Sequence, residues 1–267
     1  MATTVIKIGG ELAGCGDLLA RLAGEIGLIR ARSAYVMIHG GGAELTSLMR
    51  RMGLDPVFKD GIRMTAPEEM PFVDMVLSGQ VNKRLVRIFQ ANGLDAVGLS
   101  GSDGRLFSGR CIEADTRTGE IARVRPDLAR ALLERGHVPV ISSTSMDEET
   151  GLGLNINADS VAFALARALD AECLVFLSNI PGIMVDGRTL RRLTPADAER
   201  EIGSGAISGG MIPKVRASVE ALEGGVSRII IGAFTAETGL QALLDGRTGT
   251  QIIRGHAEQT RTEEVDR

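Results

Sequence analysis

Short runs of β-branched and other apolar residues alternate along this chain with longer stretches whose apolar positions recur at helical spacing. This alternation is typical of a mostly parallel sheet that is covered by helices on both faces. The runs that we expect to form strands are 4–8, 35–38, 96–99, 138–142, 173–177 and 228–231. The stretches that we expect to form helices are 17–30, 43–52, 67–91, 126–134, 159–169 and 212–222. The predicted fold class is α/β, a three-layer αβα sandwich around one continuous, mostly parallel central sheet.

Two segments depart from this alternation. Residues 105–123 alternate apolar and polar positions around the sequence Thr-Arg-Thr-Gly-Glu, which predicts a β-hairpin inserted in the sheet. A second hairpin is predicted over 184–193, with its turn at Asp186-Gly187. Insertions of this kind commonly form lids or dimer surfaces. The polar segment 255–267 is expected to fray as a tail.

Composition narrows the classes of protein that fit. With 267 residues, 44% hydrophobic and 24% charged, the chain can bury a large core and is not a disordered protein. A net charge of −4 and 3% aromatic residues argue against nucleic-acid binding. The three cysteines are far apart and form no CxxC pair, so neither a disulfide framework nor a zinc site is predicted. No apolar run reaches the roughly 20 residues that span a bilayer, and no basic leader precedes the first strand, so we expect a cytoplasmic protein without membrane partners.

Glycines cluster at the ends of predicted strands, where ligands gather in parallel sheets. Lys7 is followed by Gly9 and Gly10, and a lysine in a buried strand is costly unless it meets an anion. The alternative is a lysine that reaches solvent from the end of its strand. His39 is followed by Gly40, Gly41 and Gly42, whose N–H groups could bind a phosphate or a carboxylate at a helix amino terminus. A simple tight turn is the alternative.

The glycine triplet matches neither the dinucleotide fingerprint GxGxxG nor the phosphate-binding loop GxxxxGK[ST]. His39 itself is interpreted as a packing or loop-bracing residue, which is more common for such a histidine than a catalytic role. His137 and His256 have no neighbours that indicate a site. Catalysis by histidine is not expected, and neither is a dinucleotide-dependent dehydrogenase.

Two further constellations follow. Alternation in the sequence Asn155-Ile-Asn157-Ala-Asp159 would place its three polar side chains on one side of an extended segment, and Asp159 could cap the next helix. Capping alone would explain Asp159 but not both asparagines. Lys214 lies in the first turn of a predicted helix after a glycine-rich loop, where a cation opposes the helix dipole unless it serves an anion.

Six motifs then occur in the order seen in acetylglutamate kinases of the amino-acid kinase family, which the chain resembles from Val5 to Ile253. They are KIGG, HGGG, GIRMT, VLSGQVNKRLV, LNINAD and SGGMIPKV. The resemblance implies the amino-acid kinase fold over residues 1–254. Residues of about 1–155 would bind the acyl-amino acid, and those of about 156–254 would bind the nucleotide.

The resemblance also implies roles for individual residues. Lys7 and Lys214 would stabilise charge on the transferring phosphoryl group, and Asp159 would hold both lysines. The substrate would be bound by Gly41, Gly42, Arg63, Asn155 and Asn157, with Arg63 on its α-carboxylate. The nucleotide would be bound by Gly9, Gly10, Ser178, Asn179, Gly182, Gly209, Gly210 and Met211.

The implied reaction is phosphorylation of the side-chain carboxylate of N-acetyl-L-glutamate by ATP in arginine biosynthesis. A carboxylate is already a nucleophile at neutral pH, so such a transfer needs alignment and charge neutralisation rather than a general base. Magnesium is implied by ATP rather than by a carboxylate cluster in the sequence.

Other interpretations remain open at this point. Acetylglutamate kinases usually have Asp where this chain has Asn179, and LSNIPG, VNKRLV and LSGSDGRLF also resemble the kinases that act on carrier-protein-bound aminoadipate. A third interpretation is a non-catalytic sensor that keeps the fold and binds a nucleotide or an amino acid.

The assembly is a further expectation. Arginine-inhibited relatives carry an extra amino-terminal helix, whereas this chain starts directly at its first strand, so the resemblance implies an arginine-insensitive homodimer. The helix over 67–91 could supply the dimer surface through Met70, Val73, Met75 and Val76, or it could pack in the core.

Overall fold

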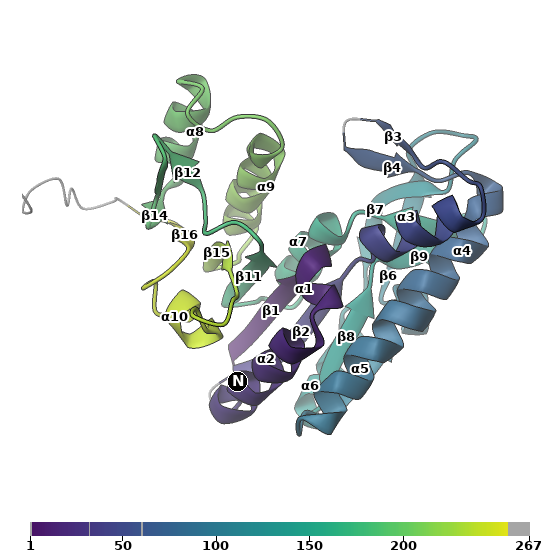
Figure 1. The fold of residues 1–267 in the computed structure, drawn as a ribbon, viewed down its shortest axis with the longest axis horizontal. Helices are drawn as coiled ribbons and strands as arrows, with labels where there is room; N and C mark the ends of the chain where they lie inside the picture. The colour runs from purple at the N-terminus through teal and green to yellow at the C-terminus, as the bar shows by residue number, and fades with distance from the viewer. Residues whose placement is uncertain (1, 32, 60, 256–267) are drawn as a thin grey trace, which may run out of the picture.

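One eight-stranded sheet runs through the molecule in the computed structural model, which describes residues 2–31, 33–59 and 61–255 (Figure 1). Neighbouring strands are parallel except for β15 and β16. In spatial order the strands are β14 (Arg192–Leu193), β16 (Thr250–Ile253), β15 (Arg228–Ala233), β11 (Cys173–Ser178), β1 (Ala2–Ile8), β2 (Ser33–His39), β8 (Val138–Ser142) and β5 (Ala96–Leu99). All six predicted strands belong to this sheet, and the predicted α/β class is confirmed. The predicted tail lies, from residue 256 on, outside the described residues.

Helices cover both faces of the sheet and enclose two apolar clusters. The first cluster includes Ile6, Ile8 and Met37 and packs against α2, α5 and α10, whereas the second includes Val5 and Val36 and packs against α6, α7 and α9. The α-helices are α1 (Gly10–Gly14), α2 (Gly16–Ile29), α3 (Gly42–Arg51), α4 (Met70–Asp74), α5 (Asn82–Ala91), α6 (Asp127–Glu134), α7 (Ala158–Ala168), α8 (Pro195–Gly203), α9 (Met211–Glu223) and α10 (Leu240–Leu244). The expected three-layer arrangement is therefore present.

The predicted helix over 67–91 is helical throughout but is not one regular helix. It consists of a 3₁₀ turn at Pro67–Glu69, α4, a π-helical segment at Met75–Val81 and α5. Pro71 lies in the first turn of α4, where its missing backbone N–H costs no hydrogen bond within the helix. Met70, Val73 and Val76 are buried in the core, whereas Met75 is exposed. Core packing thus accounts for three of the four apolar residues that we considered for a dimer surface.

The first predicted hairpin forms, but its predicted place was wrong. Strands β6 (Phe107–Cys111) and β7 (Thr118–Val124) are antiparallel neighbours in a separate four-stranded sheet with β10 (Gly153–Ile156) and β9 (Thr144–Met146). β7 pairs with β10 in parallel, with Thr118 opposite Asn155. A local alternation pattern does not reveal such a distant partner.

Two small hairpins complete the fold. β12 (Met184–Val185) and β13 (Arg188–Thr189) form the second predicted hairpin, and Asp186 and Gly187 both have positive φ as a tight two-residue turn requires. β3 (Val57–Lys59) and β4 (Ile62–Met64) form a hairpin that the sequence pattern did not indicate. No described helix is long and apolar enough to cross a membrane.

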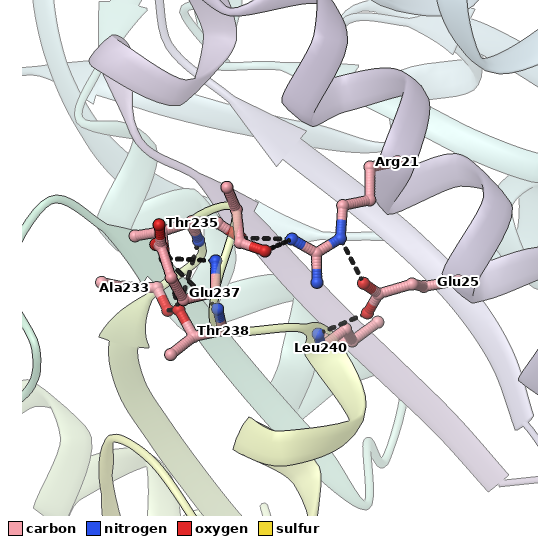
Figure 2. Close-up of polar contacts among 8 residues, drawn as sticks. Arg21, Glu25, Ala233, Thr235, Glu237, Thr238 and Leu240 are labelled. Atoms are coloured by element: carbon pink, nitrogen blue, oxygen red, sulfur yellow. Dashed lines mark hydrogen bonds and ion pairs between the residues drawn. The ribbon is translucent and has the colours of Figure 1, made fainter.

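Helix α2 is tied to the loop that follows β15 by a polar cluster (Figure 2). Arg21 donates from Nη1 to the carbonyl oxygens of Thr235, at 2.6 Å, and Ala236. Its Nε donates to Glu25 Oε1 at 2.9 Å, and Glu25 Oε2 accepts from the backbone N–H of Leu240 at 2.6 Å. One ion pair on α2 therefore fixes both the loop and the start of α10. In Figure 1 the yellow α10 lies beside the purple α2, so the cluster joins segments that are more than 200 residues apart in the sequence.

Replacement of Glu25 by alanine should lower the free energy of unfolding by about 1–3 kcal/mol, because it leaves both the Leu240 N–H and the Arg21 guanidinium without this acceptor. Urea denaturation measures the effect. Glu199→Ala is the matched control, since Glu199 is an exposed carboxylate 3.9 Å from Arg216, and its effect should stay within about 0.5 kcal/mol. Equal losses in the two variants would contradict a structural role for the cluster.

Candidate active site

The direction of Lys7 follows from the alternation of side chains along β1. Ile6 and Ile8 belong to the first apolar cluster and Val5 to the second. Lys7 shares the parity of Val5, so it faces the side of α7 and α9. β1 is an interior strand, with β11 on one side and β2 on the other. An ammonium group on this face therefore needs an anionic partner, as the sequence predicted.

Asp159 supplies that partner and also binds the second predicted lysine. Its Oδ1 lies 2.8 Å from Lys7 Nζ, and its Oδ2 lies 3.1 Å from Lys214 Nζ. The exposed fractions of the three side chains are 18% for Lys7, 25% for Asp159 and 21% for Lys214. Lys214 Nζ also lies 5.2 Å from the centre of the Phe176 ring. The structure thus brings together the three predicted catalytic residues from β1, α7 and α9.

The protonation of this triad follows from two opposing effects. Burial raises the pKa of Asp159. The charges of Lys7 and Lys214 and their hydrogen bonds lower that pKa by more than burial raises it, so it lies below its ordinary value. The carboxylate is therefore ionised at neutral pH. With two lysines the group carries a net charge of +1, which favours an anionic ligand.

The start of α7 aims Asp159 at the lysines. Asn157 is the N-cap, and its Oδ1 accepts hydrogen bonds from the backbone N–H groups of Asp159, at 2.8 Å, and Ser160, at 3.3 Å. The expectation that Asp159 could cap this helix was therefore wrong. Because Asn157 already satisfies the exposed N–H groups, the Asp159 carboxylate is free to bind the lysines, and its negative charge is favourable in the first turn.

A cavity of about 910 Å³ opens beside this triad. All five residues that we predicted for the substrate line it, together with Lys7 and Asp159 from the triad. The predicted residues on its wall are Lys7, Gly10, Gly41, Gly42, Arg63, Asn155, Asn157 and Asp159. Ligand sites in proteins commonly have this size. The wall carries two further cations, Arg50 and Arg51, which adds to its preference for an anionic ligand.

Two glycines allow close backbone approaches at this edge of the sheet. A Cβ on Gly9 would lie 2.7 Å from the carbonyl oxygen of Leu177, which also accepts the Gly9 N–H. A Cβ on Gly41 would lie within 3.0–3.2 Å of Leu77 and Val81 in the π-helical segment. A larger residue at Gly41 would push the loop away from its helix and change the direction of the N–H groups at the start of α3.

Arg63 reaches the cavity from β4 and is held on several sides. It is 9% exposed, its Nη2 donates to Thr46 Oγ1 at 2.5 Å, and its guanidinium lies 4.8 Å from the centre of the Phe58 ring. Burial lowers the pKa of Arg63, and the carboxylate of Glu69 opposes that shift. An arginine remains charged under these conditions, so a fixed cation faces the cavity.

Asn155 is positioned by threonines that the sequence analysis did not single out. Its Nδ2 donates to Thr65 Oγ1 at 2.9 Å. The hydroxyl of Thr118 accepts from the Thr65 N–H and donates to the Arg63 carbonyl oxygen, both at 2.8 Å. Thr65 belongs to the motif GIRMT and was within reach of sequence reasoning. Thr118 becomes visible only through the pairing of β7 with β10.

The residues predicted for the nucleotide lie outside the lining of this cavity, apart from Gly10. Ser178 ends β11, and the side-chain nitrogen of Asn179 donates to Glu11 Oε1 at 3.2 Å. Gly210 is the N-cap of α9 and Met211 its first residue. Ser178 and Asn179 thus lie at the carboxyl end of β11, and Gly210 and Met211 lie at the start of the helix that carries Lys214. Gly182 packs closely against Thr250.

Comparisons with known proteins identify the family. The family model described as the amino acid kinase family matches residues 2–233. An acetylglutamate kinase of Synechococcus sp. WH7803 is 39% identical over 93% of this chain and 88% of the relative, and one of Chloroflexus aurantiacus is 39% identical over 96% and 98%.

Solved structures give the same picture. The N-acetylglutamate synthase of Neisseria gonorrhoeae, solved with coenzyme A and N-acetylglutamate, has a TM-score of 0.82 at 25% identity, covering 96% of this chain and 60% of that one. A Giardia carbamate kinase has a TM-score of 0.71 at 14% identity, covering 95% and 99%, and it supports the fold alone. The chain therefore belongs to the amino acid kinase family, as a relative of its acetylglutamate kinases.

Proposed function

We propose that this protein transfers the γ-phosphoryl group of ATP to the side-chain carboxylate of N-acetyl-L-glutamate, giving N-acetylglutamyl 5-phosphate and ADP in arginine biosynthesis. The observation that carries the proposal is the bridge from Lys7 through Asp159 to Lys214 beside a cavity that holds Arg63 and the glycine loop. The acetylglutamate kinases to which the chain is similar support the same activity.

The reaction forms one bond and breaks one. A carboxylate oxygen of the substrate attacks the γ-phosphorus, and the bond from that phosphorus to the oxygen bridging to the β-phosphate breaks, so ADP leaves with that electron pair. No proton has to be removed from the nucleophile, and no histidine is among the described residues that line the cavity. Catalysis then rests on alignment and on stabilising the charge of the equatorial oxygens.

Lys7 and Lys214 are suited to that charge. They flank Asp159, which holds both ammonium groups in place and reduces their mutual repulsion. Each lysine has three donors, of which Asp159 engages one, so donors remain for phosphoryl oxygens. The lysines therefore act as electrostatic stabilisers and Asp159 as the residue that positions them.

The cavity wall supplies groups for the amino-acid substrate. Arg63 would bind the α-carboxylate through its planar guanidinium, and Asn155 would contact the acylated amino group. Gly41 and Gly42 would offer backbone N–H groups to the reacting end. Asn157 uses its carbonyl oxygen as a helix cap, and its Nδ2 group would be available to the substrate.

The nucleotide would lie on the other side of the triad, over the loop after β11 and the start of α9. Gly9, Gly10, Ser178, Asn179, Gly182, Gly209, Gly210 and Met211 are the residues that we propose for it. Residues of about 1–155 would then bind the acyl-amino acid and those of about 156–254 the nucleotide.

Within the described residues no three His, Cys, Asp or Glu side chains gather as a metal site. A Mg²⁺ would arrive with ATP, where phosphate oxygens and water would hold it, and it would neutralise phosphate charge. A homodimer is also proposed.

Three substrates separate this proposal from the alternatives: N-acetylglutamate, glutamate and N-acetylaminoadipate, each assayed by coupled ADP release and by hydroxamate trapping of the acyl phosphate. N-acetylglutamate should give the highest kcat/KM. A chain that binds N-acetylglutamate without releasing ADP would instead be a sensor. Preference for the aminoadipate analogue would favour the carrier-dependent kinases.

Lys7→Ala and Lys214→Ala should each lower kcat by about 100- to 1,000-fold, because each removes a cation that acts on transition-state charge. Steady-state kinetics and urea denaturation should show that turnover falls far more than stability. Arg216→Ala on α9 is the matched control, because Arg216 is 56% exposed and pairs with Glu199. Turnover at the wild-type rate in either lysine variant would remove that lysine from the mechanism.

Arg63→Ala should raise the KM for N-acetylglutamate by about 10- to 100-fold with a smaller change in kcat, since charge-assisted hydrogen bonds to a carboxylate act in the ground state and transition state alike. Thr46→Val tests whether the rise in KM comes from the lost hydrogen bond between Arg63 and Thr46 on α3 rather than from the lost charge. It removes that hydrogen bond but keeps the cation. An unchanged KM in Arg63→Ala would exclude Arg63 from the substrate site.

A further inference from the structure

A buried polar pair lies behind the glycine loop, and the proposed chemistry does not use it. His39, the last residue of β2, has no exposed surface, and Asn82, the first residue of α5, is 1% exposed. Buried polar side chains are costly unless they are hydrogen-bonded. The partners of this pair therefore indicate what it does.

The hydrogen bonds of His39 define the protonation of its ring. Its Nδ1 lies 2.7 Å from the carbonyl oxygen of Gly40, and its Nε2 lies 3.0 Å from Asn82 Nδ2. A carbonyl oxygen only accepts, so Nδ1 must carry the hydrogen and donate. Nε2 is then left with a lone pair, which accepts from the Asn82 amide.

The Asn82 amide can take only one orientation. Its Nδ2 also lies 2.9 Å from the carbonyl oxygen of Val140, and its Oδ1 accepts from Lys83 Nζ at 2.9 Å. A reversed amide would set its oxygen against the Val140 oxygen and its NH₂ group against the ammonium group. The surrounding strands and Lys83 therefore fix Asn82, and Asn82 fixes the tautomer of His39.

Titration does not disturb this arrangement near neutral pH. Burial lowers the pKa of His39 to about 4, aided by the charges of Arg84 and Lys83, while the Gly40 hydrogen bond and Glu44 oppose the shift. The ring is thus neutral above that pKa. A second proton would enter at Nε2 and would face the NH₂ group of Asn82.

The peptide between Gly40 and Gly41 carries this constraint to the site. His39 shares the parity of Tyr35 and Met37, whose side chains belong to the first apolar cluster, on the side of the sheet opposite Lys7. The carbonyl and the N–H of one trans peptide point in opposite directions. With its carbonyl held toward His39, this peptide directs the Gly41 N–H to the face of Lys7 and Asp159, where Gly41 lines the cavity.

We infer that His39 is a positioning residue, which holds the Gly40–Gly41 peptide so that the Gly41 N–H faces the transferring phosphoryl group. This inference rests on the proposed function. A reversed peptide would present the Gly40 carbonyl oxygen to the anionic phosphoryl oxygens, which would repel it. An N–H that is already oriented needs no reorganisation when charge develops, and such donors are most effective in the transition state.

Two variants of His39 distinguish the roles of its two ring nitrogens. The side-chain NH₂ of Asn occupies the place of Nδ1 and can donate to the Gly40 oxygen, whereas the amide of Gln occupies the place of Nε2 and reaches only Asn82. His39→Gln should therefore lower kcat by about 10- to 100-fold, with the KM values for ATP and N-acetylglutamate within about threefold of wild type. His39→Asn should keep kcat within about threefold of wild type.

A merely structural role gives the opposite order. Asn is smaller than Gln and leaves the larger cavity, so His39→Asn would then lose at least as much stability and turnover as His39→Gln. Urea denaturation of both variants supplies the stability scale. Equal kcat values in the two variants, or a greater loss in His39→Asn, would overturn the inference. A wild-type chain without ADP release would overturn both this inference and the proposed function.

Nitrogen-15 NMR of the wild-type ring tests the geometry without the reaction. The chain has three histidines, so the signal that disappears in His39→Asn assigns the ring. We expect Nδ1 to be protonated and Nε2 to be bare at pH 7.5. A ring protonated at Nε2 would contradict the hydrogen bond to Gly40 on which the inference depends.

Discussion

The interaction on which the rest of this site depends is the salt bridge of one carboxylate with two ammonium groups. Asp159 binds Lys7 from β1 and Lys214 from α9, and these residues are far apart in the sequence. Two lysines close together would repel each other without the carboxylate between them. A partly buried aspartate would in turn have a raised pKa without the lysines, and their charges reverse that effect. The result is an ionised group of net charge +1 at the edge of the sheet where the glycine loops lie.

The polar residues at this end of the sheet lie on two different faces. On the face of α7 and α9 lie Lys7 and Asp159, and on the opposite face lie His39 and Asn82. The alternation of side chains along β1 and β2 produces this division, because neighbouring residues of a strand point to opposite sides. Groups that we propose to contact the ligand can thus be supported by hydrogen bonds made on the far face, where His39 and Asn82 are buried. The glycine loop at the end of β2 connects the two.

The glycine loop after β2 packs directly against the π-helical segment at Met75–Val81. Leu77 and Val81 pack so closely against Gly41 that a Cβ there would lie 3.0–3.2 Å from them, and Asn82 follows directly as the partner of His39. The segment thus holds the loop from one side while its next residue holds the histidine. On the other half of the molecule, Arg21 and Glu25 tie α2 to the loop after β15. Both sets of contacts fix loops at the carboxyl ends of strands, where parallel sheets bind ligands.

The sequence by itself determined the six principal strands, most of the long helices, the α/β class and the family resemblance, because these follow from local periodicity and from short motifs. It also singled out Lys7 and Lys214 as cations that are unfavourable where they stand, and the family resemblance added Asp159 as their partner. Only the tertiary structure decided that Asn157 rather than Asp159 caps α7, that β6 and β7 lie in a separate sheet, and that Thr118 supports Arg63 and Asn155. These features depend on pairing between distant segments, and local sequence patterns carry no information about which strand lies beside which.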